Sequence, residues 1–527
     1  MSTQLNSDLP APAETDTSPD TSPAPSNEEA VTQNTNNKGG CCASWKKFFL
    51  YDSGRKDVQA FYFNQVGRSI LFISFMFLSL GVLQLAYQSA GCPQNENGSY
   101  INCGEKVYGM LPSDILAMMA LIGGLSTAAF MPYAGAVVDF SDHRLTFGRV
   151  CAVLLVLTNI AQIFIFPSTW FAMVIAQSFI AASTFMANSM VMWSYVNAPN
   201  DHVLHGITAS GRLWETIGML GFFVVVGVVQ FTSGWDSVSV ARFSQALASV
   251  VGGIGLFLAY KRYEPVKAVK TLENGKSLYI AGIVEIAKTA VSLWKTEPSA
   301  FVYLIASIFT EAAISSFTNL SITYLAEQLQ MSSTSIVIFI MINFVTNPLG
   351  VLIHRNVARK IGHKKNYLLC VAYTLIITAF LIGFVYEPSH ANVAFLFSVI
   401  YGVAYGWYYP SSNGYFVSIV PQEKVTELWG FNSFCSVSLS WAPPAIFIAL
   451  NQGTGSLRLG LVGTCIFLFV GLCIAVFIPE VVVAGGTDEE EGGDAVKGQV
   501  AARSPHFKLP NHTNSIKASA AAAANSA

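Results

Sequence analysis

The sequence predicts an all-α membrane protein in which twelve transmembrane helices form two bundles of six. The first observation is composition, because only 11% of the 527 residues are charged and 52% are hydrophobic, whereas a soluble domain carries about 25% charged residues. The second is that the hydrophobic residues form runs long enough to cross a bilayer, which takes about 20 residues. The third is a longer connection, 261–297, that divides the runs six and six.

Each span is predicted from one such run, and the parts of the chain follow from where the runs begin and end. The predicted spans are 66–88, 113–138, 148–166, 169–192, 213–232, 240–260, 298–325, 334–354, 366–386, 391–413, 432–450 and 457–479. The expected parts are a disordered tail over 1–45, an N-terminal six-helix bundle over 66–260, the linker 261–297, a C-terminal bundle over 298–479 and a disordered tail over 482–527. Within the linker, Leu278 to Trp294 alternates apolar and charged residues at helical spacing, which predicts a helix along the membrane interface.

The placement of lysine and arginine predicts the orientation of the chain. The N-terminal flank and the even-numbered loops carry most of these cations, whereas the odd-numbered loops and their helix ends carry only Lys106, Arg242 and Arg458. We therefore expect both termini to be cytosolic. The loop 89–112 should then face the opposite side of the membrane.

That loop contains two features of a lumenal or extracellular space. Asn97 opens the glycosylation acceptor Asn-Gly-Ser, and it lies between Cys92 and Cys103, which we expect to form a disulfide. The predicted glycosylation at Asn97 and the predicted disulfide agree with the orientation that the cations indicate.

Two loops in equivalent positions of the two halves share a glycine and a basic cluster. The first runs from Gly135 through Asp139 to Arg144, and the second contains Gly362 and Lys364. Both resemble the loop signature of the major facilitator superfamily. The resemblance implies two six-helix bundles related as a parallel repeat. It also implies a conformational latch on the cytosolic side, in which Asp139 accepts hydrogen bonds from a neighbouring helix N-terminus.

The chain departs from that signature in two places. Arg359 stands where the second loop would carry an acid, and no lysine or arginine lies between Met173 and Trp193, where the superfamily has the basic partner of the latch. A one-sided latch is therefore expected. The alternative interpretation is that Asp139 is an ordinary residue of a helix C-terminal turn.

A narrower resemblance covers about 35 residues near the C-terminal end of the last bundle. The chain reads Ser412-Asn413, then Pro421 and Glu423, then Glu427 and Gly430, and finally Ser440-Trp441 followed by Pro443. This string is similar to that of the autophagy-related vacuolar amino-acid effluxer family and its bacterial relatives. The resemblance implies amino-acid efflux from the vacuole to the cytosol. Val437 occupies a position where the family commonly has a cation, which weakens the expectation of an amino-acid substrate.

Charged residues inside spans are costly and tend to be functional, and Glu311 lies near the middle of the seventh span. We expect it to bind the coupling proton or a substrate amine, the alternative being a structural acid bonded to a neighbouring helix. Glu215 is interpreted as a first-turn helix acid, and Arg68 as a side chain that reaches the cytosolic interface. Polar residues of other spans line a central cavity or join helices: Asn319, Asn188, Asn343, Asn347, Tyr405 and Trp441.

Several function classes are not supported by any motif. The sequence contains no phosphate-binding glycine loop, no metal-ligand cluster and no nucleophile-elbow motif, so we expect no cofactor, no metal and no enzymatic activity. A net charge of −2 indicates no nucleic-acid partner. The histidines fit solvated loop positions on the cytosolic side: His143, His202, His205, His354 and His363.

The sequence therefore predicts a secondary transporter whose partners are a small-molecule substrate, protons and membrane lipids. The leading hypothesis is proton-coupled amino-acid efflux across the vacuolar membrane, with Glu311 as the coupling residue. The alternatives are a plasma-membrane transporter of a sugar or an organic anion, and a membrane nutrient sensor that does not transport.

Overall fold

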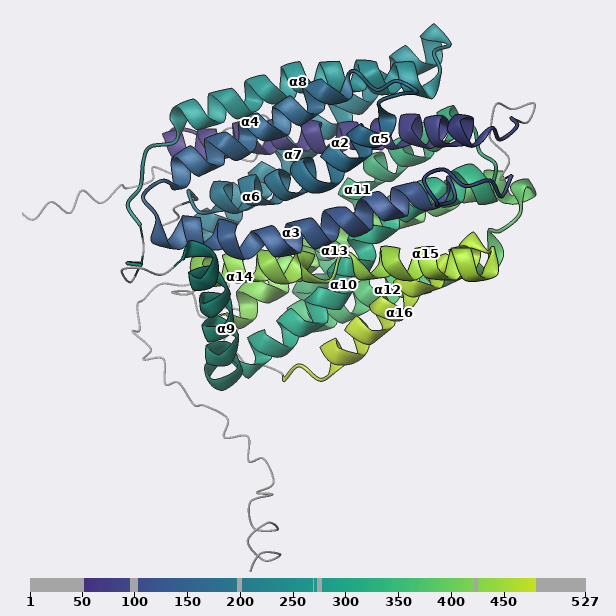
Figure 1. Ribbon diagram of the computed structural model, residues 1–527. Coiled ribbons are helices and arrows are strands. Elements are labelled where there is room, and N and C mark those ends of the chain that lie inside the picture. Colours follow the sequence, from purple (N-terminus) through teal and green to yellow (C-terminus); the bar gives the residue numbers. More distant parts are fainter. Residues whose placement is uncertain are drawn as a thin grey trace, which may run out of the picture. The chain divides into compact units, whose positions relative to one another are not determined.

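The computed structural model describes residues 52–94, 103–196, 201–268, 270–272, 277–420 and 425–479. The expectations for the two tails and for Asn97 lie outside these ranges. Twelve helices of the described residues are long and apolar enough to cross a membrane, and no β-strand occurs among those residues. The predicted fold class is confirmed, and Figure 1 shows the long helices running side by side.

The helices of the first half include one span in three pieces, because a π-helical turn interrupts it. They are α2 (Lys56–Ala90), α3 (Asp114–Phe140), α4 (Arg144–Gln162), α5 (Trp170–Ala176) with η1 (Gln177–Ala181) and α6 (Ala182–Trp193), α7 (Asp201–Ser233) and α8 (Ser237–Arg262). Two of them start well before the apolar run, since α2 begins ten residues and α7 twelve residues ahead of the predicted spans. Charged residues that the sequence placed at helix starts therefore lie deep inside these helices.

The second half follows the linker helix α9 (Leu278–Thr296). Its elements are α10 (Pro298–Thr323) with the π-helical turn η2 (Tyr324–Gln328), α11 (Ser333–Ile361), α12 (His363–Phe384), η3 (Pro388–His390) with α13 (Ala391–Ile419), α14 (Val425–Ser438) with α15 (Ala442–Thr454), and α16 (Leu457–Val476). The break between α14 and α15 precedes Pro443 and Pro444, which lack the backbone donors that a continuous helix needs.

Helices at equivalent positions of the two halves pack in the same pairs, as expected of a structural repeat. In the first half α2 packs on α8, α3 on α6 and α4 on α8; in the second half the equivalent pairs are α10 with α16, α11 with α13 and α12 with α16. Each pair of the second half is the first-half pair displaced by six spans. This displacement is what a parallel repeat of two six-helix units produces.

Two arginines show the repeat at the level of single side chains. Arg242 near the start of α8 donates from Nε to the carbonyl of Ile165 at 2.8 Å, just beyond the end of α4. Arg458 at the start of α16 donates from Nε to the carbonyl of Ile382 at 2.6 Å, in the last turn of α12. Carbonyls at a helix C-terminus carry partial negative charge, so each arginine ties the third helix of its half to the sixth.

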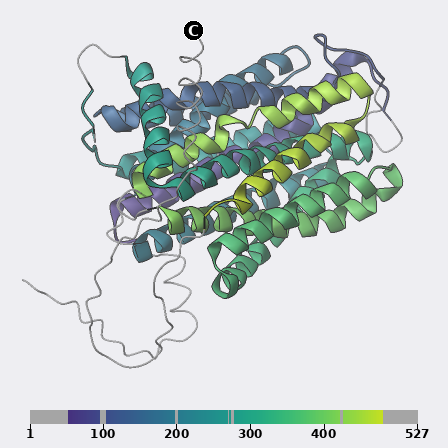
Figure 2. The ribbon, with the colours of Figure 1, turned by 90° about the horizontal axis from the view of Figure 1, so that it is seen from below.

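The bundle of long helices has two ends, and each is named after a feature that lies there. Cys92 and Cys103 form a disulfide with Cα atoms 5.4 Å apart, and this side of the bundle is called the disulfide end. The opposite side carries the connections between α3 and α4 and between α11 and α12 and is called the loop-motif end. The linker helix α9 lies at the loop-motif end, crosswise to the long helices (Figures 1 and 2).

The helix predicted from Leu278 to Trp294 is therefore present as α9, and it packs closely on α3. A Cβ atom at Gly282 would lie 2.0 Å from the carbonyl oxygen of Pro132, so this contact requires glycine. Large apolar side chains of α9 remain exposed, among them Ile280 and Trp294 at 58% each. Its location at the membrane interface remains a prediction.

Candidate transport site between the two halves

In the first half, α3 and α7 make most of the contact with the second half. α3 packs on α14, α15 and α10, and α7 packs on α11. At the crossing of α3 and α15 a Cβ at Gly124 would lie 2.8 Å from the backbone nitrogen of Trp441, so the two backbones touch there. Small residues allow membrane helices this approach.

At the disulfide end, polar side chains join the halves directly. Asp114 in the first turn of α3 accepts hydrogen bonds from Asn451 Nδ2 at 2.7 Å and from Gln452 Nε2 at 3.0 Å, both at the end of α15. Ser237 donates to Ser333 Oγ at 2.7 Å between α8 and α11. Asp114 is fully buried by these contacts. The disulfide end is therefore closed by bonds that separation of the halves would break.

Between the two ends, the first half holds a charge cluster that the sequence did not indicate. Arg68 Nη2 of α2 lies 3.8 Å from Glu215 Oε1 of α7, and Arg212 Nη1 lies 2.9 Å from Glu215 Oε2. The side chains of Arg68 and Glu215 are 8% and 12% exposed, whereas that of Arg212 is 44% exposed. The interpretations of Arg68 and Glu215 as residues at helix starts are wrong, since both lie more than three turns inside their helices.

The exposed Arg212 side chain points away from lipid and toward the second half. The lipid-facing side of α7 is marked by exposed apolar side chains at Ile217, Val224, Val228 and Phe231. At about 100° per residue, Arg212 lies on roughly the opposite side of the helix. Its guanidinium is 5.5 Å from the centre of the Tyr409 ring, which belongs to α13 of the second half. A solute between the halves can therefore reach this cation.

The second half presents Glu311 and a group of tyrosines to the same region. The Glu311 carboxylate forms a side-chain hydrogen bond with Tyr408 and interacts electrostatically with Arg212. The Tyr408 hydroxyl is 2.8 Å from Thr310 Oγ1, and the Tyr405 and Tyr409 hydroxyls are 3.4 Å apart. Two of the predicted site residues, Glu311 and Tyr405, thus meet near the missed Arg212.

One face of α10 stays accessible around Glu311. Within α10 from Ala300 to Thr323, Ser315 is the only exposed residue, although the helix lies in the centre of the bundle. Glu311, Thr318 and the predicted Asn319 are half-buried on the same face, because residues three and four apart lie above one another on a helix. This polar face looks toward the space between the halves.

Two aromatic side chains of the first half lie beside the charge cluster. Phe72 of α2 stacks on Phe185 of α6 with ring centres 5.1 Å apart, and the Arg68 guanidinium lies 4.8 Å from the Phe185 centre. Phe72 is 36% exposed although its neighbours in α2 from Gly67 to Ser74 are buried. An apolar surface therefore lies beside the charge cluster.

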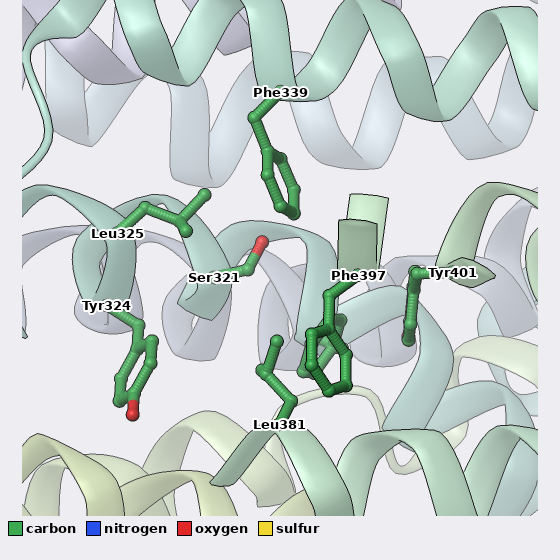
Figure 3. A pocket seen from close by; sticks show the side chains of 8 residues that line it. Ser321, Tyr324, Leu325, Phe339, Leu381, Phe397 and Tyr401 are labelled. Atoms are coloured by element: carbon green, nitrogen blue, oxygen red, sulfur yellow. The ribbon is translucent and has the colours of Figure 1, made fainter. Parts of the chain in front are cut away.

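A separate small cavity lies inside the second half and is unsuitable for a solute. Its lining includes Phe317, Ser321 and Tyr324 of α10 and η2, together with Phe397 and Tyr401 of α13 (Figure 3). Its volume is about 10 Å³, which is the space for at most one water molecule. At about 100° per residue, its lining residue Phe317 lies about 120° around α10 from Glu311.

Other predicted site residues have different surroundings. Asn188 is fully buried and donates to the Tyr260 hydroxyl at 2.8 Å, within the first half. Asn343 and Asn347 lie where α11 packs on α13, since a Cβ at Gly406 would be 1.9 Å from the Asn347 carbonyl oxygen. Trp441 lies at the α3–α15 crossing and donates from Nε1 to the Ser438 carbonyl at 3.0 Å. These residues join helices around the cluster but are not brought together with it.

The predicted latch residues hold each half together. Arg144 Nη2 donates to the carbonyl of Lys267 at 2.8 Å, just after α8, and Lys364 Nζ donates to the carbonyl of Ile478 at 2.7 Å, just after α16. The Asp139 carbonyl accepts from the backbone nitrogen of Lys270 at 2.9 Å. Gly135 lies under Met190, and Gly362 ends α11 with φ +81°. Each basic residue thus ties its loop to the sixth helix of the same half.

One histidine departs from the expectation of solvated loops. His354 is half-buried, with Nδ1 2.9 Å from both Ser411 Oγ and Asn366 Nδ2. The expectation was wrong because α11 continues to Ile361, seven residues beyond the predicted end.

The chain also resembles known proteins. A sequence model of the family described as "Vacuole effluxer Atg22 like" matches residues 204–481, just over half of the chain. The chain belongs to the vacuole effluxer Atg22-like family. The matched range covers the second half, the linker and most of α7, including Arg212 and Glu215. Among curated proteins, none matches the chain closely enough to count as a relative.

Solved transporters have the same fold at low sequence identity. The xylose transporter XylE from E. coli superposes with a TM-score of 0.56 at 15% identity, covering 82% of this chain and 99% of that one. The nucleoside transporter NupG gives 0.51 at 15%, covering 80% and 98%, and the peptide transporter POT gives 0.53 at 13%, covering 80% and 95%. This Atg22-like chain therefore has the fold of these transporters.

Proposed function

We propose that this transporter exports amino acids from a vacuole-like lumen to the cytosol and that an acidic lumen drives the export with protons. The observation that carries the proposal is the placement of opposite charges on the two halves: an accessible Arg212 on α7 lies within electrostatic range of Glu311 on α10. An amino acid carries a carboxylate for the first and an ammonium for the second. The family's vacuolar description supports the direction.

The remaining contacts give each part of an amino acid a partner. Arg212 supplies a planar guanidinium that can bind a carboxylate through two hydrogen bonds. The exposed Phe72 supplies an apolar surface for a side chain. Tyrosine hydroxyls around Glu311 supply neutral hydrogen-bonding groups. A site of this kind accepts neutral amino acids of different size.

Proton coupling requires a carboxyl that gains and loses a proton during the cycle, and Glu311 is positioned for this. It lies on the accessible face of α10 and has an arginine of the other half nearby. When the halves separate, Arg212 moves away from Glu311, so the carboxylate loses a stabilising charge. Protonation then compensates for that loss.

The disulfide end is proposed to face the lumen. It carries the Cys92–Cys103 disulfide, which forms in oxidising compartments. The loop-motif end, with its lysines and arginines, would face the cytosol together with both termini.

Reconstituted vesicles test the proposal. The full chain is placed in proteoliposomes with an acidic interior, and release of a mixture of trapped labelled amino acids is followed. Release that depends on the pH step and is lost in Arg212→Met supports the proposal. Binding of amino acids without release would instead indicate a sensor.

A second candidate is an organic anion, and one observation favours it. The first half contributes two guanidiniums, Arg68 and Arg212, and a single carboxylate, Glu215. If Glu311 is protonated, the cluster has a net positive charge, which suits a solute with no ammonium group. Competition of lactate and of alanine for labelled release separates the two candidates, because only alanine competes if an ammonium is required.

A further inference from the structure

Polar residues recur at every fourth position along α10 and continue into η2. Glu311, Ser315, Asn319 and Thr323 are followed by Glu327 in the π-helical turn. Four residues of helix rise about 6 Å and turn about 400°, so each of these residues lies about 40° further around the helix than the one before. The residues therefore form a winding row, here called the polar row, from the transport site to the disulfide end, with a carboxyl at each extremity.

The two extremities of the polar row have different neighbours. At one extremity Glu311 interacts with Arg212 of the first half. Beside the other, Ala326 packs against the cluster of Leu83, Tyr87 and Cys92, also of the first half. Ser321 and Tyr324 line the small cavity of Figure 3 inside the second half. Separation of the halves at the disulfide end would therefore change the surroundings of the turn that carries Glu327.

Accessibility changes along the row. Ser315 is exposed and Asn319 is half-buried, but Thr323 is completely buried. Thr323 Oγ1 and both carboxyl oxygens of Glu327 have less than 1 Å² of accessible surface each and no hydrogen-bond partner. Glu327 as a residue is half-buried, but its two carboxyl oxygens are out of contact with water in this conformation.

A carboxylate in those surroundings would be costly. An ionised group removed from water without a partner loses several kcal/mol of solvation. No charged side chain of the described residues acts on Glu327. On the packed elements, Arg458 of α16 is bonded to the carbonyls of Ile382 and Gly383 at the end of α12, α11 begins with neutral serines, and α2 contributes the Tyr87 phenol. These surroundings favour the neutral form of the Glu327 carboxyl, in which it holds a proton.

We propose that Glu327 is a proton-binding site at the disulfide end, separate from Glu311. When the halves separate at that end, the carboxyl is exposed and exchanges its proton with water. When they close, the site retains the proton and the carboxyl remains neutral. The step is a proton transfer between water and the Glu327 carboxylate, with no other bond changed. The π-helical turn that carries the residue is a feature common at functional sites. Only the role in coupling depends on the proposed export.

Infrared spectroscopy of the purified full chain at neutral pH tests this binding without any transport. The band of a protonated carboxyl should be lost in Glu327→Gln and kept in Glu387→Gln, a matched control on an exposed glutamate at the same end. A band unchanged in Glu327→Gln overturns the proposal. If Glu327→Gln does not fold, Glu327→Met serves, because a neutral, unpartnered carboxyl can be replaced by an apolar side chain of similar size without loss of stability. A marked loss of melting temperature in Glu327→Met would show an ionised, paired carboxylate and would also overturn it.

The coupling role is tested in the same proteoliposomes. Exchange of labelled for unlabelled solute at equal pH should be retained in Glu327→Gln, whereas release driven by a pH step should be lost. Equal pH dependence in the variant and the wild type would remove Glu327 from the coupling. If the wild type transports no amino acid, the export proposal fails, but the infrared result still decides the proton site.

Discussion

Glu215 lies between two arginines with different surroundings, and replacing it separates a buried ion pair from an accessible one. Removing one partner of a buried pair costs about 3–5 kcal/mol, because the other charge remains buried without compensation. Arg68 is in that position, since its side chain is 8% exposed and its Nε has no partner. Arg212 is 44% exposed, and pairs of that kind contribute about 0–1 kcal/mol.

We therefore expect Glu215→Gln to lower the free energy of unfolding by about 3–5 kcal/mol, and Arg212→Met to lower it by less than about 1 kcal/mol. The double variant Arg68→Met with Glu215→Met should recover nearly wild-type stability, because apolar residues of similar volume replace a buried pair at little cost. Unfolding by denaturant in detergent micelles measures the three values on one scale.

Transport should not follow stability in these variants. If the cluster is the transport site, Arg212→Met and the double variant are stable but inactive in vesicle release. The reasoning would be refuted if Glu215→Gln and Arg212→Met destabilised the protein equally, since the two pairs would then be alike. A double variant that transports normally would show that the cluster has only a structural role.

Further predictions concern the coupling carboxyl of Glu311, the closed disulfide end, the crossing of α3 and α15, and the loss of stability at acidic pH. Glu311→Gln should abolish pH-driven release while expression and melting temperature are retained. Asp114→Ala removes two hydrogen bonds between the halves and should increase labelling of cysteines introduced between them near the disulfide end. Gly124→Val should block folding or transport because the α3–α15 backbones touch, whereas Gly221→Val, with no atom within 4 Å, should be tolerated. Outside the spans, burial opposes the charge of Asp236, but hydrogen bonds from Ser239 and Gln84 outweigh it and hold the pKa of Asp236 below its usual value. The stability that this cap provides is then present at neutral pH and is lost as pH falls through that lowered pKa, so Asp236→Asn should flatten the acid side of the melting profile.

The number of helices and the repeat could be predicted from the sequence because both depend on the hydrophobicity of long segments. The start of a helix could not, since hydropathy marks where the apolar run begins and not where the backbone becomes helical. α2 begins at Lys56 and α7 at Asp201. This difference placed Arg68 and Glu215 at the membrane surface in the prediction, although they lie inside the bundle. The three-residue spacing of Arg212 and Glu215 was the available signal, since such a pair can face inward together.

The candidate site was predicted only in part for a related reason. Polar residues in spans join helices or line a site, and the sequence does not distinguish these roles. Asn188 bonds to Tyr260 inside one half, whereas Tyr405 is brought near Glu311 and Arg212. Whether a polar residue joins helices or lines the site depends on which face of its helix packs against the neighbouring helices. Arg144 and Lys364 were predicted only as members of a conformational latch, and the structure adds that each bonds to a carbonyl of its own half.

The charges of the site are divided unevenly between the halves, and this division links selectivity to movement. The first half contributes Arg212 with its partner Glu215, and the second contributes Glu311 among tyrosine hydroxyls. Closing the halves around a solute brings these charges into a space with less water, where an uncompensated charge is more costly. A solute with both an anionic and a cationic group compensates both halves at once, whereas a solute with one charge leaves the other half uncompensated unless a proton binds. In the proposed cycle, the same electrostatic requirement therefore selects the solute and couples its passage to protons.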